Sequence, residues 1–413
     1  MPLEPSRLEP TPRRVGRSNR SANSRDARYD CICRDSDNWT TEQISIQDLC
    51  YRADPVPEIR VIFLPGVADI ESLGVHYQLS SRFRVPHGFW SSVAQNASGF
   101  LGCQETTENS EGLGSFSSSF IFLVKEPVKS NPLLSVANNV KISYIWHRMG
   151  FYTIWSPFKT LVVLCFGLPL PLKYSLSSLA HLSLDNPLSF HAILTEKVIA
   201  LYDTSLWSWR NLVRDVEQNR TLPENPQPDY VTMHELARHA IHSSETLAVA
   251  IETIASLIQE HEIFFNENAS LLVVSITQSK QAMRALRSHI ALLRCLYLRS
   301  KALEERLRNE INLAFNTVAQ HDSRIAVLIG KSTQADSAAV KTISVLGLAF
   351  LPGTFICALF STSFFNFSPG GSADPQHWTI SEKFWIYWAV AIPLTVATVA
   401  CWFMWQRLDS SLR

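Results

Sequence analysis

This chain of 413 residues contains few cysteines and has no net charge. Long stretches of it also lack charged residues. Eight cysteines are too few for a disulfide-stapled scaffold. Lys plus Arg and Asp plus Glu both number 37, so the net charge is zero and gives no reason to expect nucleic acid as a partner. Charged residues make up 18%, below the ~25% usual for soluble domains. The missing charge must therefore be concentrated in uncharged segments.

Large apolar side chains are rare at the start of the chain, where arginine, proline and serine dominate. Such a segment buries too little surface to repay its ordering entropy, which predicts a disordered basic N-terminus over residues 1–44. It has no apolar h-region, so we do not expect a secretory signal. Pro2 and Pro5, with Glu4 and Glu9, disfavour the acid-poor amphipathic helix of a mitochondrial presequence.

Residues 45–187 are predicted to form a cytoplasmic α/β domain. Short apolar runs bounded by turn residues indicate strands at Arg60–Leu64, Phe120–Val124 and Tyr152–Trp155. The apolar run Leu161–Leu172 is interrupted by glycine and proline and falls short of the ~20 residues that span a bilayer. We expect it to be a buried strand or core segment.

Proline is absent between Pro228 and Pro352, and residues 188–341 are predicted to be helical. Asp229–Phe265 is expected to be one helix. A second begins near Leu271, and its apolar residues recur in steps of three and four, which indicates a long stalk helix with one packed stripe. If it runs unbroken to Phe360 it is ~135 Å long at 1.5 Å per residue. Such a coiled-coil-like stalk is typical of a protein that leads into a membrane.

Charge is absent from residue 342 to residue 373 and again from 384 to 405. These stretches predict transmembrane helices over 342–364 and 384–406, joined by a short external loop over 365–383 and followed by a cytoplasmic tail over 407–413. Trp385 and Trp388 at one end of the second span, and Trp402 and Trp405 at the other, match aromatic belts. Both spans contain a central proline, which membrane helices tolerate.

The charges that flank the spans predict their orientation. Lys331 and Lys341 precede the first span and Arg407 follows the second, whereas the loop carries Asp374 and Glu382 against one lysine. The positive-inside rule then places both termini in the cytoplasm, with the plasma membrane or another cellular membrane preferred over the mitochondrial inner membrane. One hairpin of two helices cannot enclose a pore, so we expect a homo-oligomer in a lipid bilayer.

The run Phe350-Leu351-Pro352-Gly353-Thr354-Phe355-Ile356 resembles the F-L-P-x-T-F-I signature in the first membrane helix of CorA-type divalent-cation channels. The stretch from Asn316 to Phe367 is similar to a divergent fungal branch of that superfamily. The resemblance implies an α+β membrane protein with an N-terminal α/β domain, a long helical stalk and two C-terminal transmembrane helices. It also implies a homopentamer whose first spans line the pore, with Mg²⁺ or a related divalent ion as cargo and no bound cofactor.

This chain departs from the family at the G-M-N filter. The three corresponding positions are Ser361, Thr362 and Ser363. Asn366 follows, and it could replace the filter asparagine only if the helix ran one turn further. A ring of carboxamide oxygens can accept hydrogen bonds from the water shell of Mg²⁺, and a ring of hydroxyls can do so less directionally.

Steps of three and four back along the first span predict a pore-lining stripe. The stripe comprises Val340, Ser344, Gly347, Leu351, Thr354 and Ser361. Its alternative interpretation is a helix-packing face with small residues at the contacts. Asp336 and Asp374 are candidate acidic groups at the two pore mouths, the alternatives being a solvated stalk acid and an ordinary turn residue before proline.

Other motifs point to no further chemistry. His234 and His239 are five residues apart, not the four that a zinc-protease helix requires, and His239 with His242 lacks a carboxylate partner. Cys31 and Cys33 have no second cysteine pair, which disfavours a zinc site. The basic run from Lys280 to Arg308 could repel cations, bind anionic lipid, pair with a neighbouring helix or form a solvated stalk face.

Two functions from different classes follow from the sequence. The first is a CorA-like channel that lets divalent cations flow passively through a homopentameric pore. The second is a non-conducting, membrane-anchored regulatory or structural protein that has lost the filter. No catalytic constellation supports an enzyme.

Overall fold

The computed structural model describes residues 28–35, 38–51, 57–106, 114–128, 142–156, 160–176, 182, 184, 186–221, 224–268, 276–368 and 377–411. Side chains at 276–278, 360–368, 377 and 409–411 are outside this description. The chain divides into two compact units. The first comprises residues 1–222 and 227–315, and the second comprises 223–226 and 316–413. The prediction that residues 1–27 are disordered lies outside the described residues.

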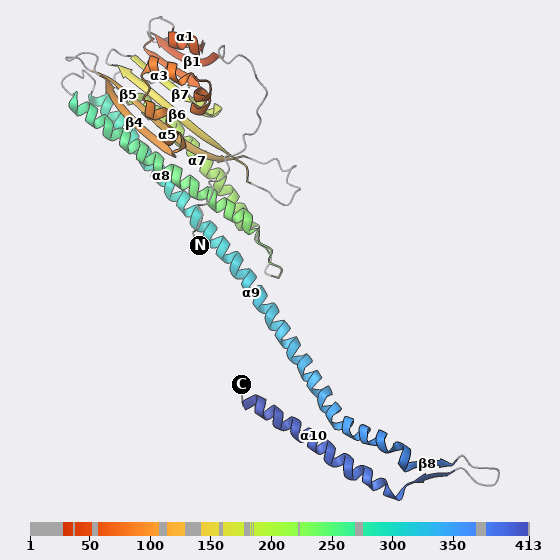
Figure 1. Ribbon diagram of the computed structural model, residues 1–413. Coiled ribbons are helices and arrows are strands. Elements are labelled where there is room, and N and C mark those ends of the chain that lie inside the picture. The colour runs from red at the N-terminus through yellow and green to blue at the C-terminus, as the bar shows by residue number, and fades with distance from the viewer. Residues whose placement is uncertain are drawn as a thin grey trace, which may run out of the picture. The chain divides into compact units, whose positions relative to one another are not determined.

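The first unit is built on a seven-stranded mixed sheet in the order β2-β1-β3-β7-β6-β5-β4 (Figure 1). Only the β3–β7 pair is parallel, among the pairs that the structure describes. The strands are β1 (Arg28–Asp35), β2 (Asn38–Ser45), β3 (Ile59–Leu64), β4 (Gly99–Thr106), β5 (Ser115–Pro127), β6 (Tyr144–Ser156) and β7 (Thr160–Phe166).

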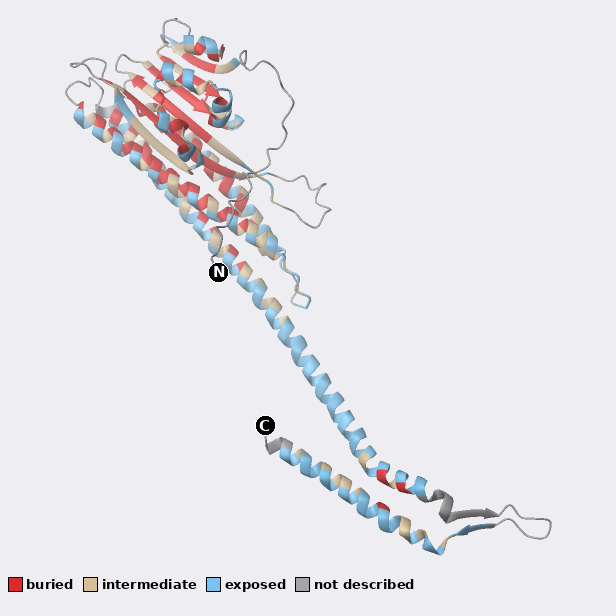
Figure 2. Ribbon diagram, viewed as in Figure 1, coloured by how far each residue is buried: buried red, intermediate tan, exposed pale blue. Residues whose placement is uncertain are grey.

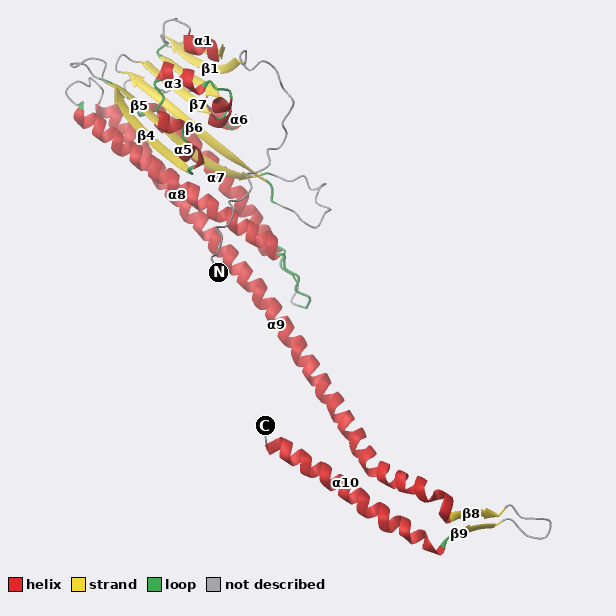
Figure 3. Cartoon of the chain, viewed as in Figure 1, coloured by secondary structure: helices red, strands yellow, loops and turns green. Residues whose placement is uncertain are grey.

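Helices cover both faces of this sheet (Figure 3). Short helices lie on one face: α1 (Ile46–Tyr51), α2 (Val67–Ser72), α3 (His76–Phe83), α4 (His87–Trp90) and α5 (Ser92–Asn96). The other face carries α6 (Leu170–Leu176), α7 (Ser189–Gln218), α8 (Tyr230–Glu267) and the first part of α9 (Ile276–Phe364). The predicted α/β class is thus confirmed as a three-layer arrangement.

The three predicted strands are confirmed as parts of β3, β5 and β6. The run Leu161–Leu172 is divided between β7 and α6, as a core segment. Successive residues of β7 enter opposite cores: Val163 and Cys165 face the long helices, and Leu164 and Phe166 face the short ones. This alternation follows from the two-residue period of a strand, and burial on both faces explains its unbroken apolar sequence.

The predicted disordered segment, residues 1–44, extends too far into the chain. Residues 28–45 form β1 and β2, so the sheet begins well before residue 45. The composition was misleading because β2 is an edge strand whose side chains are mostly exposed. Edge strands carry polar residues that discourage pairing with other chains, and that composition resembles a disordered segment. β1 contributes buried apolar side chains at Cys31, Ile32 and Cys33, whereas β2 contributes one, at Ile44.

The first part of α9 is docked in the core of the first unit. Its buried side chains recur in steps of three and four, as predicted, and they include Leu286, Ile290, Leu293, Leu296, Ser300, Leu303 and Leu307. Figure 2 shows buried residues along this part of α9 and exposed residues farther along the helix. The helix is continuous through Gly330, which does not break it. The predicted helix Asp229–Phe265 corresponds to α8, and the Asp229 carboxylate caps its N-terminus by accepting from the Thr232 amide at 3.0 Å.

Three of the eight basic residues from Lys280 to Arg308 pair with acidic groups of adjacent helices. Arg306 contacts Glu217 through two hydrogen bonds of 2.7 and 2.5 Å. Arg220 approaches Glu310 in the same bidentate way at 2.9 and 2.5 Å. Arg287 pairs with Glu262 of α8 at 2.6 Å. Of the interpretations that the sequence left open, pairing with neighbouring helices therefore describes part of this run, and Lys301 and Arg308 pair within α9 itself.

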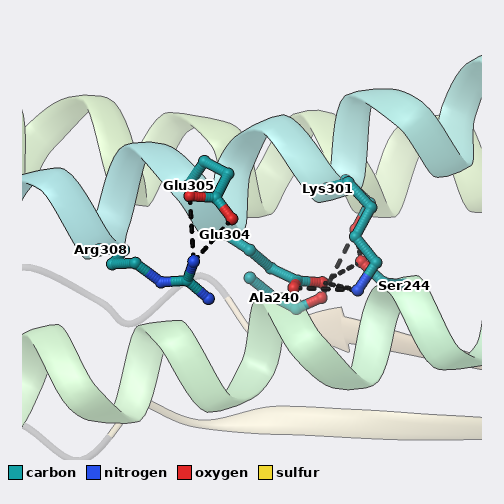
Figure 4. Close-up of polar contacts among 7 residues, drawn as sticks. Ala240, Ser244, Lys301, Glu304, Glu305 and Arg308 are labelled. Atoms are coloured by element: carbon teal, nitrogen blue, oxygen red, sulfur yellow. Dashed lines mark hydrogen bonds and ion pairs between the residues drawn. The ribbon is translucent and has the colours of Figure 1, made fainter.

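A polar seam joins α8 to α9 (Figure 4). The Ser244 hydroxyl donates to the Glu304 carboxylate, and its oxygen lies 2.9 Å from the Ser300 hydroxyl. Lys301 contacts the same carboxylate at 3.0 Å. Small residues at this seam let the two helices approach closely, and every polar group drawn there has a partner.

The second unit holds the end of α9, from residue 316, and α10 (Trp385–Ser411). The predicted external loop contains two short paired strands, β8 (Phe365–Ser368) and β9 (His377–Ile380), followed by a 3₁₀ turn η3 (Glu382–Phe384). Figure 1 shows α9 bending in this unit. Pro352 lies inside the helix and removes one backbone hydrogen bond, a common cause of such bends.

The docking of α9 predicts a contrast between two adjacent leucines. Leu293 is 1% exposed and Leu292 is 51% exposed. We expect Leu293→Ala to lower the free energy of unfolding of the sheet unit by ~2–5 kcal/mol, because it removes buried methyl groups and leaves a cavity. Leu292→Ala should change it by less than ~0.5 kcal/mol. Denaturant titration of the full chain in detergent, followed by near-UV circular dichroism, measures both, and equal effects would contradict the docking.

Candidate functional site

Two helices of the chain are long and apolar enough to cross a membrane. One lies within Ser279–Leu359 and the other is Glu382–Leu408. Large apolar side chains of the second unit are exposed along both helices, with Trp385, Trp388 and Trp405 among them. Water does not favour an apolar surface of this extent, so a membrane or partner chains must cover it. The two predicted spans therefore correspond to the end of α9 and to α10.

The end of α9 packs against α10 along a narrow face. Ile356 and Ala391 are 6% and 5% exposed, and Pro352 is also buried. The Tyr387 hydroxyl of α10 donates to the Gly353 carbonyl at 3.3 Å. A Cβ at Gly353 would lie 3.9 Å from that hydroxyl, which is an ordinary van der Waals distance. This contact closes the helical hairpin within one chain.

The predicted pore stripe avoids that packing face. Val340 and Leu351 are 62% and 71% exposed, and Ser344, Gly347 and Thr354 are exposed as well. At 100° per residue the centre of the stripe is roughly 130° around the helix from the line through Leu348, Pro352 and Ile356. Leu351 and Thr354 also border a shallow groove with Leu394 and Thr398 of α10. The centre of the stripe thus lies away from the surface that α10 covers, and Leu351 and Thr354 lie at the border between the two.

The two hydroxyls of the stripe whose side chains the structure describes, on Ser344 and Thr354, are already satisfied as donors. Ser344 donates to the Val340 carbonyl at 2.8 Å, and Thr354 donates to the Leu351 carbonyl at 3.0 Å. Each oxygen keeps lone pairs that can accept a hydrogen bond from water. A Cβ at Gly347 would meet no atom within 4 Å, so no helix of the same chain approaches there.

The three filter positions and Asn366 lie in different secondary-structure elements. Ser361, Thr362 and Ser363 belong to the last turn of α9, which ends at Phe364. Asn366 lies in β8, where it pairs with Thr379. The extra helical turn that would place Asn366 in the filter is therefore not present. The side chains at these four positions, and Asp374 as a whole, lie outside the described residues, and Asp336 is exposed on α9.

The histidines of α8 do not form a metal site. His239 is buried between Trp209 and Tyr144, with ring centroids 4.8 and 4.9 Å away. Neither of its ring nitrogens has a hydrogen-bond partner, and burial lowers its pKa to about 3. His242 instead contacts the buried Lys125 ammonium at 2.9 Å. His239 is therefore packed between aromatic rings of the core.

A buried serine and histidine also meet within the sheet unit. The Ser118 hydroxyl lies 2.7 Å from His191 Nε2 and 2.6 Å from the Thr153 hydroxyl. His191 Nδ1 lies 3.0 Å from the Pro187 carbonyl. A nucleophile must reach a substrate, and Ser118 is inaccessible to solvent. These contacts hold α7 against β5 and β6.

Sequence reasoning missed one polar cluster, on β1 and β2. Cys31 and Cys33 are buried, their sulfurs are 3.4 Å apart, and Glu42 of β2 lies 3.4 Å from the Cys33 sulfur. The hydrogen bond between the sulfurs raises the pKa of the Cys31 thiol and lowers that of Cys33. The alternating Cys-x-Cys pattern was a visible strand signal, but Glu42 becomes a neighbour only through the β1–β2 register.

Comparison with known proteins gives limited information. No family model matches the chain. The "Notoamide biosynthesis cluster protein M'" of Aspergillus versicolor is 33% identical over 226 residues, which are 51% of this chain and 47% of that protein. The chain therefore matches about half the length of this relative.

Two solved structures resemble the chain weakly. The full-length CmaX protein has a TM-score of 0.45 at 12% identity and covers 94% of this chain and 100% of its own. The ZntB cytoplasmic domain from Vibrio parahaemolyticus has a TM-score of 0.36 at 9% identity, over 69% of this chain and 98% of its own. Both TM-scores are too low to assign a function, which we infer from residues of this chain.

Burial of His191 predicts a loss of stability in acid. Burial lowers the pKa of His191 to about 4, against ~6.5 in an unfolded chain. The unfolded state therefore binds the proton first, so this contribution to stability is complete above pH ~6.5 and falls as the pH drops toward 4. We expect His191 alone to lower the free energy of unfolding by ~2 kcal/mol between pH 7 and pH 5.

Thermal unfolding of the full chain in detergent, recorded between pH 7 and pH 5, measures this dependence. His191→Leu should reduce this dependence by the share of His191, whatever its effect at neutral pH, and buried histidines such as His239 supply the rest. The exposed His87, replaced in His87→Gln, is the matched control and should leave the dependence unchanged. An identical pH dependence in wild type and His191→Leu would contradict the assignment.

Proposed function

We propose that the chain is a CorA-like metal-ion transport protein through which a divalent cation, Mg²⁺ first among the candidates, flows passively. The observation that carries the proposal is the exposed stripe on α9. The stripe belongs to the helix that contains the Phe350–Ile356 signature, and it lies away from the face that packs on α10. The observed order of a mixed sheet, a long helix and a second apolar helix is also the order that the signature implies.

The membrane setting is supported by exposure and flanking charge. Apolar side chains are exposed along both candidate spans. Lys331, Lys341 and Arg407 flank them at one end, whereas Glu382 and Lys383 flank the other. The positive-inside rule then places both termini and the sheet unit in the cytoplasm.

A pore requires more than one chain. Two helices that touch along one face cannot surround water, so the stripe would line a lumen only when several copies assemble. We propose the homopentamer that the signature implies, with α9 inside and α10 outside. Val340 and Leu351 would then form apolar constrictions that gate by dewetting, and Asp336 would face the cytoplasmic mouth. Ser361–Ser363, in the last turn of α9, would take the filter positions, with Asp374 beyond the outer mouth.

Ser344 and Thr354 supply the chemistry that a hydrated cation needs. Their hydroxyls donate within the helix, so their oxygens face the stripe as acceptors. Rings of such oxygens can accept hydrogen bonds from the water shell of Mg²⁺, which dehydrates reluctantly. The serine and threonine at the filter positions would extend this hydroxyl lining.

The residues at the filter positions favour a second candidate function, because they differ from the family's G-M-N motif. Ser361-Thr362-Ser363 replaces G-M-N, and Asn366 lies on β8 and not on the helix. A chain that lost its filter would keep the docked helix and the spans as a non-conducting, membrane-anchored regulatory or structural protein. The two candidates differ in whether the stripe contacts water.

Cysteine accessibility tests for water along the stripe. In a chain whose exposed thiols Cys295, Cys357 and Cys401 are replaced by serine, we expect Ser344→Cys and Thr354→Cys to react with a hydrophilic thiol reagent. Val396→Cys is the matched control, because Val396 is exposed on α10 and should face lipid. Protection of both stripe positions would contradict a water-filled lumen.

Cation flux tests transport directly. We expect liposomes carrying the purified wild type to take up Mg²⁺, or one of Zn²⁺, Co²⁺ and Ni²⁺, because the stripe lines an open lumen. Thr354→Trp should abolish uptake, since five indole rings would fill the lumen, and Val396→Trp on α10 should not. Absence of flux for all four ions, from chains shown to be assembled, would favour the regulatory scaffold.

A further inference from the structure

The β1–β2 hairpin carries three metal-ligating side chains that the proposed transport function does not use. Cys31 and Cys33 lie on one face of β1, because they are two residues apart in a strand. The register pairs Cys31 with Glu42 of β2, which brings the carboxylate to the same face. The three ligand atoms lie within 4.8 Å of one another.

The spacing of these atoms suits tetrahedral zinc. Zinc binds sulfur at ~2.3 Å and carboxylate oxygen at ~2.0–2.2 Å, so a tetrahedral ion holds two sulfurs about 3.8 Å apart and a sulfur and an oxygen about 3.6 Å apart. The Cys31 and Cys33 sulfurs are 3.4 Å apart, and the Cys33 sulfur is 3.4 Å from a Glu42 oxygen. Small side-chain rotations would therefore complete the geometry without moving the strands.

A disulfide fits this pair poorly. Residues two apart in a strand have Cα atoms about 6.6–6.8 Å apart, at the upper limit for a disulfide, and their Cβ atoms point the same way. The strand β1 is hydrogen bonded to β2 on one side and to β3 on the other. Bending it to bring the sulfurs to bonding distance would disrupt both ladders.

Arg60 completes the charge balance. Arg60 of β3 is the register partner of Cys33 on β1, and its charge lowers the pKa of the Cys31 and Cys33 thiols. Its Nε atom is buried without a hydrogen-bond partner. Two thiolates, one carboxylate, one guanidinium and one divalent ion sum to zero net charge. A buried cluster of charges is tolerated when it is neutral as a whole.

We propose that Cys31, Cys33 and Glu42 bind one Zn²⁺ ion, with the fourth position left to water. Glu42 is exposed while both thiols are buried, so the ion enters from the solvent side. The bound ion links the edge strand β2 to β1, its single neighbour in the sheet order. The site lies in the first unit and does not depend on whether the second unit conducts ions.

Titration of the full chain with Co²⁺, which substitutes for Zn²⁺, tests the site. In detergent, with a reductant and after removal of metal, we expect one Co²⁺ per chain to produce sulfur-to-cobalt charge-transfer absorption. Zn²⁺ should abolish it by displacement, and excess Mg²⁺ should not, because Mg²⁺ prefers oxygen ligands. Oxygen-lined cation sites elsewhere in the chain give no such absorption, so transported ions do not interfere.

Variants assign the ligands. Cys31→Ser and Cys33→Ser should lose the absorption, whereas Cys103→Ser, which changes a partly buried thiol on β4, should retain it. Glu42→Gln alters an exposed side chain and should fold normally, yet weaken Co²⁺ binding by at least ~10-fold. Zn²⁺ should also raise the unfolding temperature of the wild type and not that of Glu42→Gln.

Three results would overturn the proposal. The first is no charge-transfer absorption in protein whose thiols are shown to be reduced. The second is absorption that persists in both Cys31→Ser and Cys33→Ser. The third is a Cys31–Cys33 disulfide in the isolated protein, detected by mass spectrometry.

Discussion

The continuity of α9 is the constraint on which the rest of the structure depends. A helix satisfies its own backbone hydrogen bonds. One helix can therefore pass from a water-exposed domain into a lipid bilayer without exposing an unpaired backbone group. Over its first part α9 buries leucines such as Leu286 and Leu303 against the sheet unit. Beyond residue 316 its side chains are largely exposed, and from residue 342 onward their composition is that of a membrane span. Neither part needs a break in the helix.

The docked part of α9 is fixed by apolar burial and by charge together. Leu293 and Leu307 fill the core, while Arg306 and Arg220 make bidentate contacts with Glu217 and Glu310. Exposed ion pairs contribute little to stability, but bidentate geometry restricts how a helix can slide or rotate. Burial therefore supplies most of the free energy, and the paired charges set the register of α9 against the end of α7.

The long helices and spans could be predicted because their signals are local. The absence of proline between residues 229 and 351, and the steps of three and four, depend on single helices, and the structure has α8 and α9 there. β1 and β2 could not be recognised because their stability comes from neighbouring strands, and β2 is polar at the sheet edge. The contact of Glu42 with Cys33, like that of Arg306 with Glu217, joins residues that only the fold brings together.

The same distinction applies to the proposed pore. The stripe from Val340 to Thr354 could be predicted because its members share one helix face, and the contact with α10 lies on another. The end of α9 at Phe364 matches the end predicted for the first span. The pairing of β8 with β9 beyond it could not be predicted, because it joins two short segments that only the fold brings together. In the proposed pore, where Asn366 lies on a strand, the hydroxyl oxygens of Ser344 and Thr354 would take the place of carboxamide oxygens as acceptors for the ion's water shell. Hydroxyl acceptors rotate and are less directional than a fixed amide, so a pore built from them would favour hydrated divalent cations as a class over one ion.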